Sequence, residues 1–120
     1  MTVAAPYLLA VLCAGWCSSC ERFRPDYLGP ALAATAEHRL WIDIDDDADA
    51  LPDNLDIASL PMLLVAASPH QATYFGPVRP DVQVVQRLAR WHGTDPSADD
   101  LLARVVRRWL HPVSTTPSRS

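Results

Sequence analysis

The stretch YLLAVLCAGWCSSC, residues 7–20, joins an apolar run to two closely spaced cysteines. Its first half, residues 7–13, is continuously apolar and of strand length, which is typical of a strand covered on both faces of a sheet. Its second half separates Cys17 from Cys20 by two residues, at the point where a helix is predicted to begin. A buried strand, a short loop and a helix in this order indicate an α/β unit.

The length and composition of the chain suit one domain with a modest core, since it has 120 residues of which 49% are hydrophobic. We expect a single domain over residues 1–112 and a disordered tail over residues 113–120, whose Ser, Thr, Pro and Arg side chains have nothing to bury. A net charge of −4 gives no reason to expect nucleic acid or an anionic membrane surface as a partner. No apolar run approaches the roughly 20 residues that a membrane span needs.

The first apolar run must also be compared with an export signal, which would carry a basic segment before it and a cleavage site after it. No Lys or Arg precedes Arg22, and cleavage near Ala14 would fall against Trp16 and Cys17. We therefore interpret the run as a buried strand, with an export signal as the alternative, and expect a cytoplasmic protein. In that reducing compartment, closely spaced cysteines are more often catalytic or metal-binding than structural.

The rest of the chain shows no repeat and no linker, and its hydropathy pattern predicts the remaining elements. The predicted strands cover residues 39–44, 61–67 and 72–75. The predicted helices are one over residues 18–37 disturbed by Pro25 and Pro30, a short one ending near Ile57, one that begins at Asp81, and one over 98–110. The helix from Asp81 is expected to carry Val84, Val85, Leu88 and Trp91 on one side. The order indicates an α/β domain in which helices cover both faces of a mixed, four-stranded sheet.

The cysteine pair carries the most specific chemistry in the sequence. The thiolate is the reactive form of cysteine, and the unpaired N–H groups and partial positive charge of a helix N-terminus favour it. Cys17 is the expected attacking sulfur, and Cys20, one turn later, can resolve the mixed disulfide. Trp16 offers a flat apolar shoulder for a substrate, while Ser18 and Ser19 add hydroxyl and amide donors.

Metal binding is the main alternative for these cysteines. A zinc ribbon needs a second pair of ligands, and no two of the remaining candidates, which are Cys13, His38, His70, His92 and His111, form one. The spacing of Cys13, Cys17 and Cys20 also occurs in iron–sulfur proteins, but Cys13 ends a strand run and is most simply a small buried hydrophobe. The acidic stretch over residues 45–53 lacks the spacing of a calcium loop. We therefore predict no metal site.

Several landmarks together resemble the thioredoxin family from about Tyr7 to Trp91. Besides the W-C-x-x-C motif, they are Pro25, five residues past the second cysteine; the strand end Asp43-Ile44-Asp45; the segment Ser59-Leu60-Pro61-Met62-Leu63-Leu64-Val65; and Gly76 after the expected hairpin. The resemblance implies a thioredoxin-like fold in which the Leu60–Pro61 bond is cis and faces the cysteine pair. It further implies that Cys17 and Cys20 form a redox-active disulfide, with no other cofactor, and that Trp16, Ser18, Ser19, Leu60, Pro61 and Gly76 bind the substrate.

The sequence also departs from the family pattern. The six residues before Tyr7 cannot supply the usual first strand and helix, and the helix over 98–110 is additional, so we expect that helix to cover apolar surface left bare. Val11 stands where the family carries a buried Asp that assists proton transfer, and Trp41 where it carries the accompanying Lys. Asp43 is a possible substitute for that Asp, although a solvated or capping role is the simpler interpretation.

The functional prediction is a thiol–disulfide oxidoreductase that reduces or exchanges disulfides in protein substrates and maintains cellular redox balance. Its electrons would come from a thioredoxin-reductase-type enzyme or a small thiol. The alternative is a non-enzymatic, thioredoxin-like adaptor that uses the cysteine pair as a redox switch. The Ser18-Ser19 dipeptide does not set the direction of electron flow, because potentials of such pairs vary widely.

Overall fold

The computed structural model describes residues 5–53, 55 and 59–110, so the predicted tail over 113–120 and the predicted helix end near Ile57 lie outside the described residues. Four strands form one sheet: β1 (Leu8–Cys13), β2 (His38–Asp43), β3 (Met62–Ser68) and β4 (Gln71–Pro77). The helices are α1 (Ser18–Leu28), α2 (Val82–Ala89) and α3 (Asp99–Trp109), with short 3-10 turns η1 (Pro30–Leu32), η2 (Ala48–Ala50) and η3 (Pro96–Ala98). The predicted α/β class is confirmed.

The sheet has the strand order β2-β1-β3-β4. Strands β1 and β2 are parallel, whereas β1 with β3 and β3 with β4 are antiparallel, which confirms the predicted mixed sheet. Central strand β1 is buried over all six of its residues, because neighbouring strands flank it on both sides and helices cover both faces. Its apolar run therefore marked a buried strand, as predicted.

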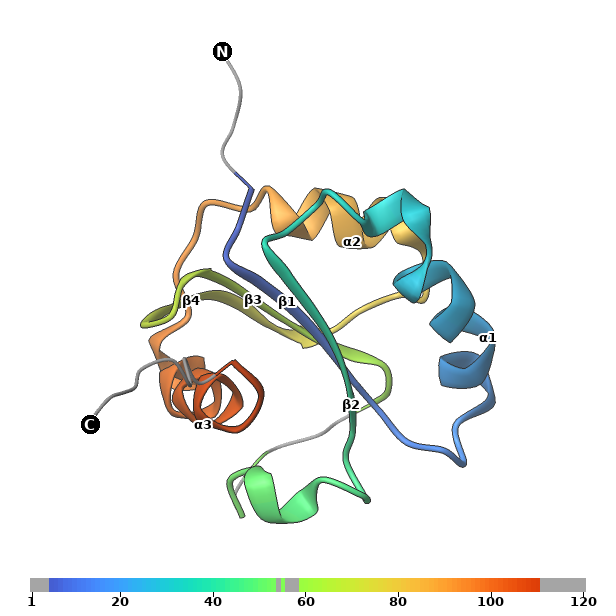
Figure 1. Ribbon diagram of the computed structural model, residues 1–120, viewed down its shortest axis with the longest axis horizontal. Helices are drawn as coiled ribbons and strands as arrows, with labels where there is room; N and C mark the ends of the chain where they lie inside the picture. Colours follow the sequence, from blue (N-terminus) through green and yellow to red (C-terminus); the bar gives the residue numbers. More distant parts are fainter. Residues whose placement is uncertain (1–4, 54, 56–58, 111–120) are drawn as a thin grey trace, which may run out of the picture.

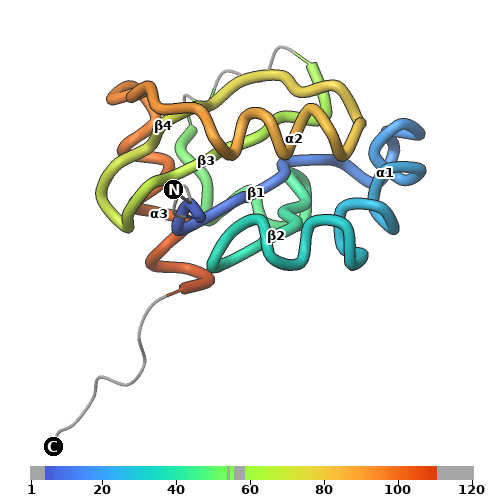
Figure 2. The backbone as a smooth tube through the Cα atoms, turned by 90° about the horizontal axis from the view of Figure 1, so that it is seen from above, coloured from blue at the N-terminus to red at the C-terminus, as the bar shows by residue number. Residues whose placement is uncertain are grey.

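Alternate residues of β1 enter two separate cores (Figure 1). On one face, Leu8, Ala10 and Leu12 pack with α3. On the other face, Leu9, Val11 and Cys13 pack with α1 and α2, and Figures 1 and 2 show α3 on the opposite side of the sheet from these two helices. The side-chain period of two in a strand explains this division.

The C-terminal helix α3 lies against the sheet, as the sequence analysis expected. Its fully or nearly buried side chains are Leu101, Leu102 and Val105, and Val106, Trp109 and Leu110 are partly buried around them. Their spacing follows the helical period, and Arg107 and Arg108 lie in the last turn, where positive charge complements the helix dipole. The helix thus packs on the sheet face that carries Leu8, Ala10 and Leu12.

Two helical predictions were wrong in their extent. The first helix ends at Leu28 instead of continuing to residue 37, because Gly29 is extended and Pro30 cannot continue a helix. The guanidinium of Arg39 donates hydrogen bonds to the carbonyls of Tyr27 and Gly29 at 3.0 and 2.7 Å, which satisfies this helix end. The second error concerns Trp91, which was expected on the apolar side of the helix that begins at Asp81. The helix α2 ends at Ala89, before Trp91, and the Trp91 side chain is 57% exposed.

Candidate functional site

The two motif cysteines occupy different sides of the first turn of α1. Cys17 is the N-cap residue of the helix and is partly exposed, whereas Cys20 is fully buried. The buried residues of α1 are Cys20, Phe23 and Tyr27, at helical spacing, so this stripe faces the sheet. Cys13, the last residue of β1, points to the same core.

Cys20 is bonded to Cys13, not to Cys17. The disulfide joins residues whose Cα atoms are 5.8 Å apart, a usual separation for a disulfide, and Cys17 remains a free thiol. The expected Cys17–Cys20 disulfide is therefore not the pair in the structure, and Cys13 is more than a buried hydrophobe. The physical reason is that Cys20 faces inward from α1 and meets the inward-facing end of β1.

The Cys17 thiol lies among hydrogen-bond donors. Its Sγ atom is 3.4 Å from the hydroxyl of Ser19, and the backbone N–H groups of Ser19 and Cys20 also face it. The Ser19 hydroxyl is the largest influence that lowers the pKa of the Cys17 thiol below its usual value, and partial burial opposes it. A lowered pKa increases the thiolate fraction near neutral pH, so Cys17 has the character of a nucleophile.

Replacing Ser19 with alanine is expected to raise the pKa of the Cys17 thiol, because the strongest hydrogen bond to the thiolate is lost. The pH profile of Cys17 alkylation by iodoacetamide should move to higher pH, and the rate near pH 7 should fall. The neighbouring variant Ser18→Ala is the matched control, since Ser18 is not among the groups that lower this pKa. An unchanged profile in Ser19→Ala would mean that the hydroxyl does not stabilise the thiolate.

Trp16 is 72% exposed and is held in place by the acidic loop. Its indole Nε1 donates a hydrogen bond to the Asp45 carboxylate at 3.0 Å. The exposed indole next to Cys17 offers a large apolar surface on which another molecule could pack. The sequence singled out Trp16 as such a shoulder, but it did not find its partner Asp45.

Asp43 connects the end of β2 to the cysteine loop. Its Oδ1 atom accepts hydrogen bonds from the N–H groups of Asp45 and Asp46 at 2.8 and 3.0 Å, and its carboxylate also faces the N–H group of Gly15. These amides, that of Asp46 first, lower the pKa of Asp43 below its usual value. The capping role is the one that the hydrogen bonds define.

The variant Asp43→Ala is expected to lose about 1 kcal/mol of unfolding free energy near pH 7, since the capped amides lose their acceptor. Because the folded pKa of Asp43 is depressed, its contribution is fully present above the unfolded pKa near 3.8 and is lost progressively as pH falls from there through the lower folded pKa. Urea unfolding at pH 7 and at pH 3 measures both effects. Asp46→Ala, which removes an exposed carboxylate, is the control, and equal losses in both variants would contradict the capping role.

Val11 on β1 and Trp41 on β2 stand at the positions where the thioredoxin resemblance implies a buried Asp and a Lys. Val11 and Trp41 are register partners on the two parallel strands, and Val11 is fully buried. The Trp41 ring lies 5.7 Å from the Tyr27 ring and 6.5 Å from the Phe23 ring, measured between centroids. The core around Cys13 and Cys20 is therefore built from aromatic and aliphatic side chains.

The Leu60–Pro61 peptide bond is cis, as predicted. Because Leu12 pairs with Met62 in antiparallel register, the next residue of β1, Cys13, lies beside Pro61. Leu60 packs against both cores, one of which contains Cys13 and Cys20. Among the described residues, no backbone hydrogen bond involves Leu60, while the Pro61 carbonyl accepts one from Val78 at 3.0 Å.

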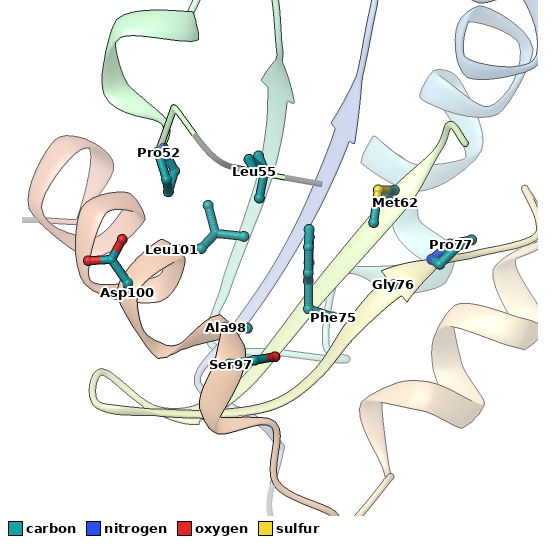
Figure 3. A pocket seen from close by; sticks show the side chains of 10 residues that line it. All are labelled: Pro52, Leu55, Met62, Phe75, Gly76, Pro77, Ser97, Ala98, Asp100 and Leu101. Atoms are coloured by element: carbon teal, nitrogen blue, oxygen red, sulfur yellow. The ribbon is translucent and has the colours of Figure 1, made fainter. Parts of the chain in front are cut away.

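Gly76 lies apart from this group, on β4, which is separated from β1 by β3. It lines a pocket of about 450 Å³ on the α3 side, where Figure 3 shows Phe75 between Leu101 and Met62. The structure thus places Trp16, Ser18 and Ser19 next to Cys17, Leu60 against the core that holds Cys13 and Cys20, and Gly76 opposite Leu63, two residues past Pro61. The residue that sequence reasoning undervalued is Cys13, although the alternation of β1 placed it on the face that α1 covers.

In residues 5–53, 55 and 59–110, no group of three or more His, Cys, Asp or Glu side chains is arranged to hold a metal ion. Within the same ranges, no helix has the length and apolar character to cross a membrane. Comparison with known proteins found no matching family model and no significantly similar curated protein or solved structure.

Proposed function

We propose that this protein is a thioredoxin-like thiol–disulfide oxidoreductase that reduces or exchanges disulfides in protein substrates. The observation that carries the proposal is the three-cysteine cluster, in which a partly exposed thiol with a lowered pKa stands one helical turn from a cysteine already able to form a disulfide. A purely structural disulfide would not require an activated thiol beside it.

In the reduced protein, the Cys17 thiolate attacks a substrate disulfide and releases one substrate sulfur as a thiolate. The products are a mixed disulfide at Cys17 and one free substrate thiol. The Cys20 thiolate then attacks Cys17 Sγ, which releases the second substrate thiol and leaves a disulfide within the protein. Two electrons pass from the protein to the substrate, and a small thiol or a reductase must restore them.

The surface around Cys17 supports a protein substrate. Trp16 stands out of the surface with its indole anchored by Asp45, and Leu60, which precedes Pro61, packs against the core that holds Cys13 and Cys20. In this proposal the backbone of Leu60 pairs with an extended substrate segment in the manner of strand addition.

The decisive test is reduction of insulin by the purified protein with dithiothreitol as the electron source, followed as precipitation of the reduced B chain. The proposal expects catalysis above the rate of dithiothreitol alone. A parallel assay with a thioredoxin reductase and NADPH identifies the class of donor. If the protein adds nothing to the background rate in either assay, the oxidoreductase proposal fails.

One observation favours the adaptor as a second candidate. The Val11–Trp41 pair occupies positions where thioredoxins keep an acidic group and a lysine, and its apolar packing provides no proton relay for Cys20. An adaptor would hold a partner without turnover, and its affinity would differ between the reduced and oxidised protein. Absence of insulin reduction together with redox-dependent retention of a partner would support this candidate.

A further inference from the structure

The disulfide partner of Cys20 points to a third redox position behind the motif. Cys13 and Cys20 are 1% and 0% exposed, so a dissolved disulfide or thiol cannot reach either sulfur directly. Cys17 is the one member of the cluster open to solvent, and it is the free thiol. The buried bond and the accessible thiol are therefore separate, although they share one turn of helix.

We propose that Cys13 is a catalytic residue that accepts the disulfide from Cys17, so that the oxidised enzyme rests as Cys13–Cys20 with its nucleophile free. This inference rests on the proposed oxidoreductase function and extends it. Once Cys17 and Cys20 are bonded, the Cys13 thiol gives up its proton, which ends in solvent water, and its sulfur attacks Cys20 Sγ. The Cys13–Cys20 bond forms, the Cys17–Cys20 bond breaks, and Cys17 leaves as a thiolate. No electron enters or leaves the protein in this step.

The surroundings of each sulfur favour this direction. A thiol that is stable as a thiolate is a good leaving group, and the Ser19 hydroxyl with the amides of Ser19 and Cys20 supplies that stability to Cys17. Cys13 lies in an apolar core among Leu9, Val11 and Phe23, where a neutral disulfide is better accommodated than a charged thiolate. The charge therefore moves to the solvated position and the neutral bond to the buried one.

Reduction follows the reverse route. The Cys17 thiolate attacks Cys20 Sγ and releases Cys13, and an external thiolate then attacks the exposed Cys17 Sγ and releases Cys20. A second external thiol removes the first from Cys17, so that two external thiols become one disulfide and the protein recovers three thiols. Every exchange with the outside thus passes through Cys17.

The test begins with fully reduced protein, oxidised by one equivalent of oxidised glutathione, quenched, alkylated with iodoacetamide and mapped by peptide mass spectrometry. We expect one alkyl group on Cys17 and a Cys13–Cys20 disulfide in the wild type. In Cys13→Ala and Cys13→Ser we expect a Cys17–Cys20 disulfide and no alkyl group. Two substitutions are used because Ser leaves a buried hydroxyl, and thermal unfolding under reducing conditions identifies any variant that fails to fold.

A second variant separates the relay from a merely structural disulfide. In Cys17→Ser, the Cys13–Cys20 bond should form at least about tenfold more slowly, because the intramolecular route through Cys17 is lost. Formation at the wild-type rate, or a Cys17–Cys20 disulfide in the oxidised wild type, would overturn the relay. These outcomes do not depend on insulin, so a protein that shows the relay with glutathione but leaves insulin untouched would refute only the proposed substrate reaction.

Discussion

Replacing Cys17 with serine is expected to lower the rate of insulin reduction at least about 100-fold, because a serine hydroxyl is not ionised near neutral pH and cannot attack a disulfide. Cys17 is the cysteine that the structure leaves both accessible and unbonded, so no other thiol of the chain can take its place at the surface. The loss should appear with dithiothreitol and with an enzymatic donor alike.

The same chemical change at the buried cysteine, Cys13→Ser, affects only the later step of the proposed cycle. This variant keeps Cys17 and Cys20, so its first turnover, measured as substrate thiols released in a single-turnover experiment, should be far less affected than that of Cys17→Ser. If Cys17→Ser reduces insulin as fast as the wild type, Cys17 is not the nucleophile and the mechanism above is wrong.

Replacing Leu102 with alanine is expected to lower the free energy of unfolding by about 3 kcal/mol, the middle of the range for a fully buried leucine. Leu102 is 0% exposed and lies in the core between α3 and the sheet, with Leu8, Leu12 and Leu64 of the central strands. Because domains of this size are stable by only about 5–15 kcal/mol, the loss should move the urea midpoint strongly.

Leu28 offers a control of the same residue type, since it ends α1 and is 42% exposed. Leu28→Ala should lower the free energy of unfolding by about 0.5 kcal/mol or less, as is usual for substitutions at the surface. Equal destabilisation by the two variants would contradict the placement of α3 as the cover of this face. A large effect confined to Leu102→Ala would confirm that the C-terminal helix belongs to the cooperative unit.

The order and type of the elements were predictable because each one carries a local signal. Residues 7–13 form an uninterrupted apolar run, and Asp81 caps α2 by accepting a hydrogen bond from the N–H of Gln83 at 2.8 Å. Such signals depend on side-chain period and on backbone groups within a few residues. The extent of α1 was overestimated because its apolar spacing continues past Leu28, while Gly29 and Pro30 end it.

Within the candidate site, the sequence by itself determined that a cysteine stands at the start of a helix, since the motif follows a strand run and opens a helical pattern. It did not determine which sulfur bonds to Cys20. Spacing along the chain favours Cys17, three residues away, but the partner is chosen by the faces that meet in space. The stripe of α1 turns Cys20 toward the sheet, and the alternation of β1 turns Cys13 toward α1. Only the packing of those two faces decided that Cys13 holds the disulfide and that Cys17 is free.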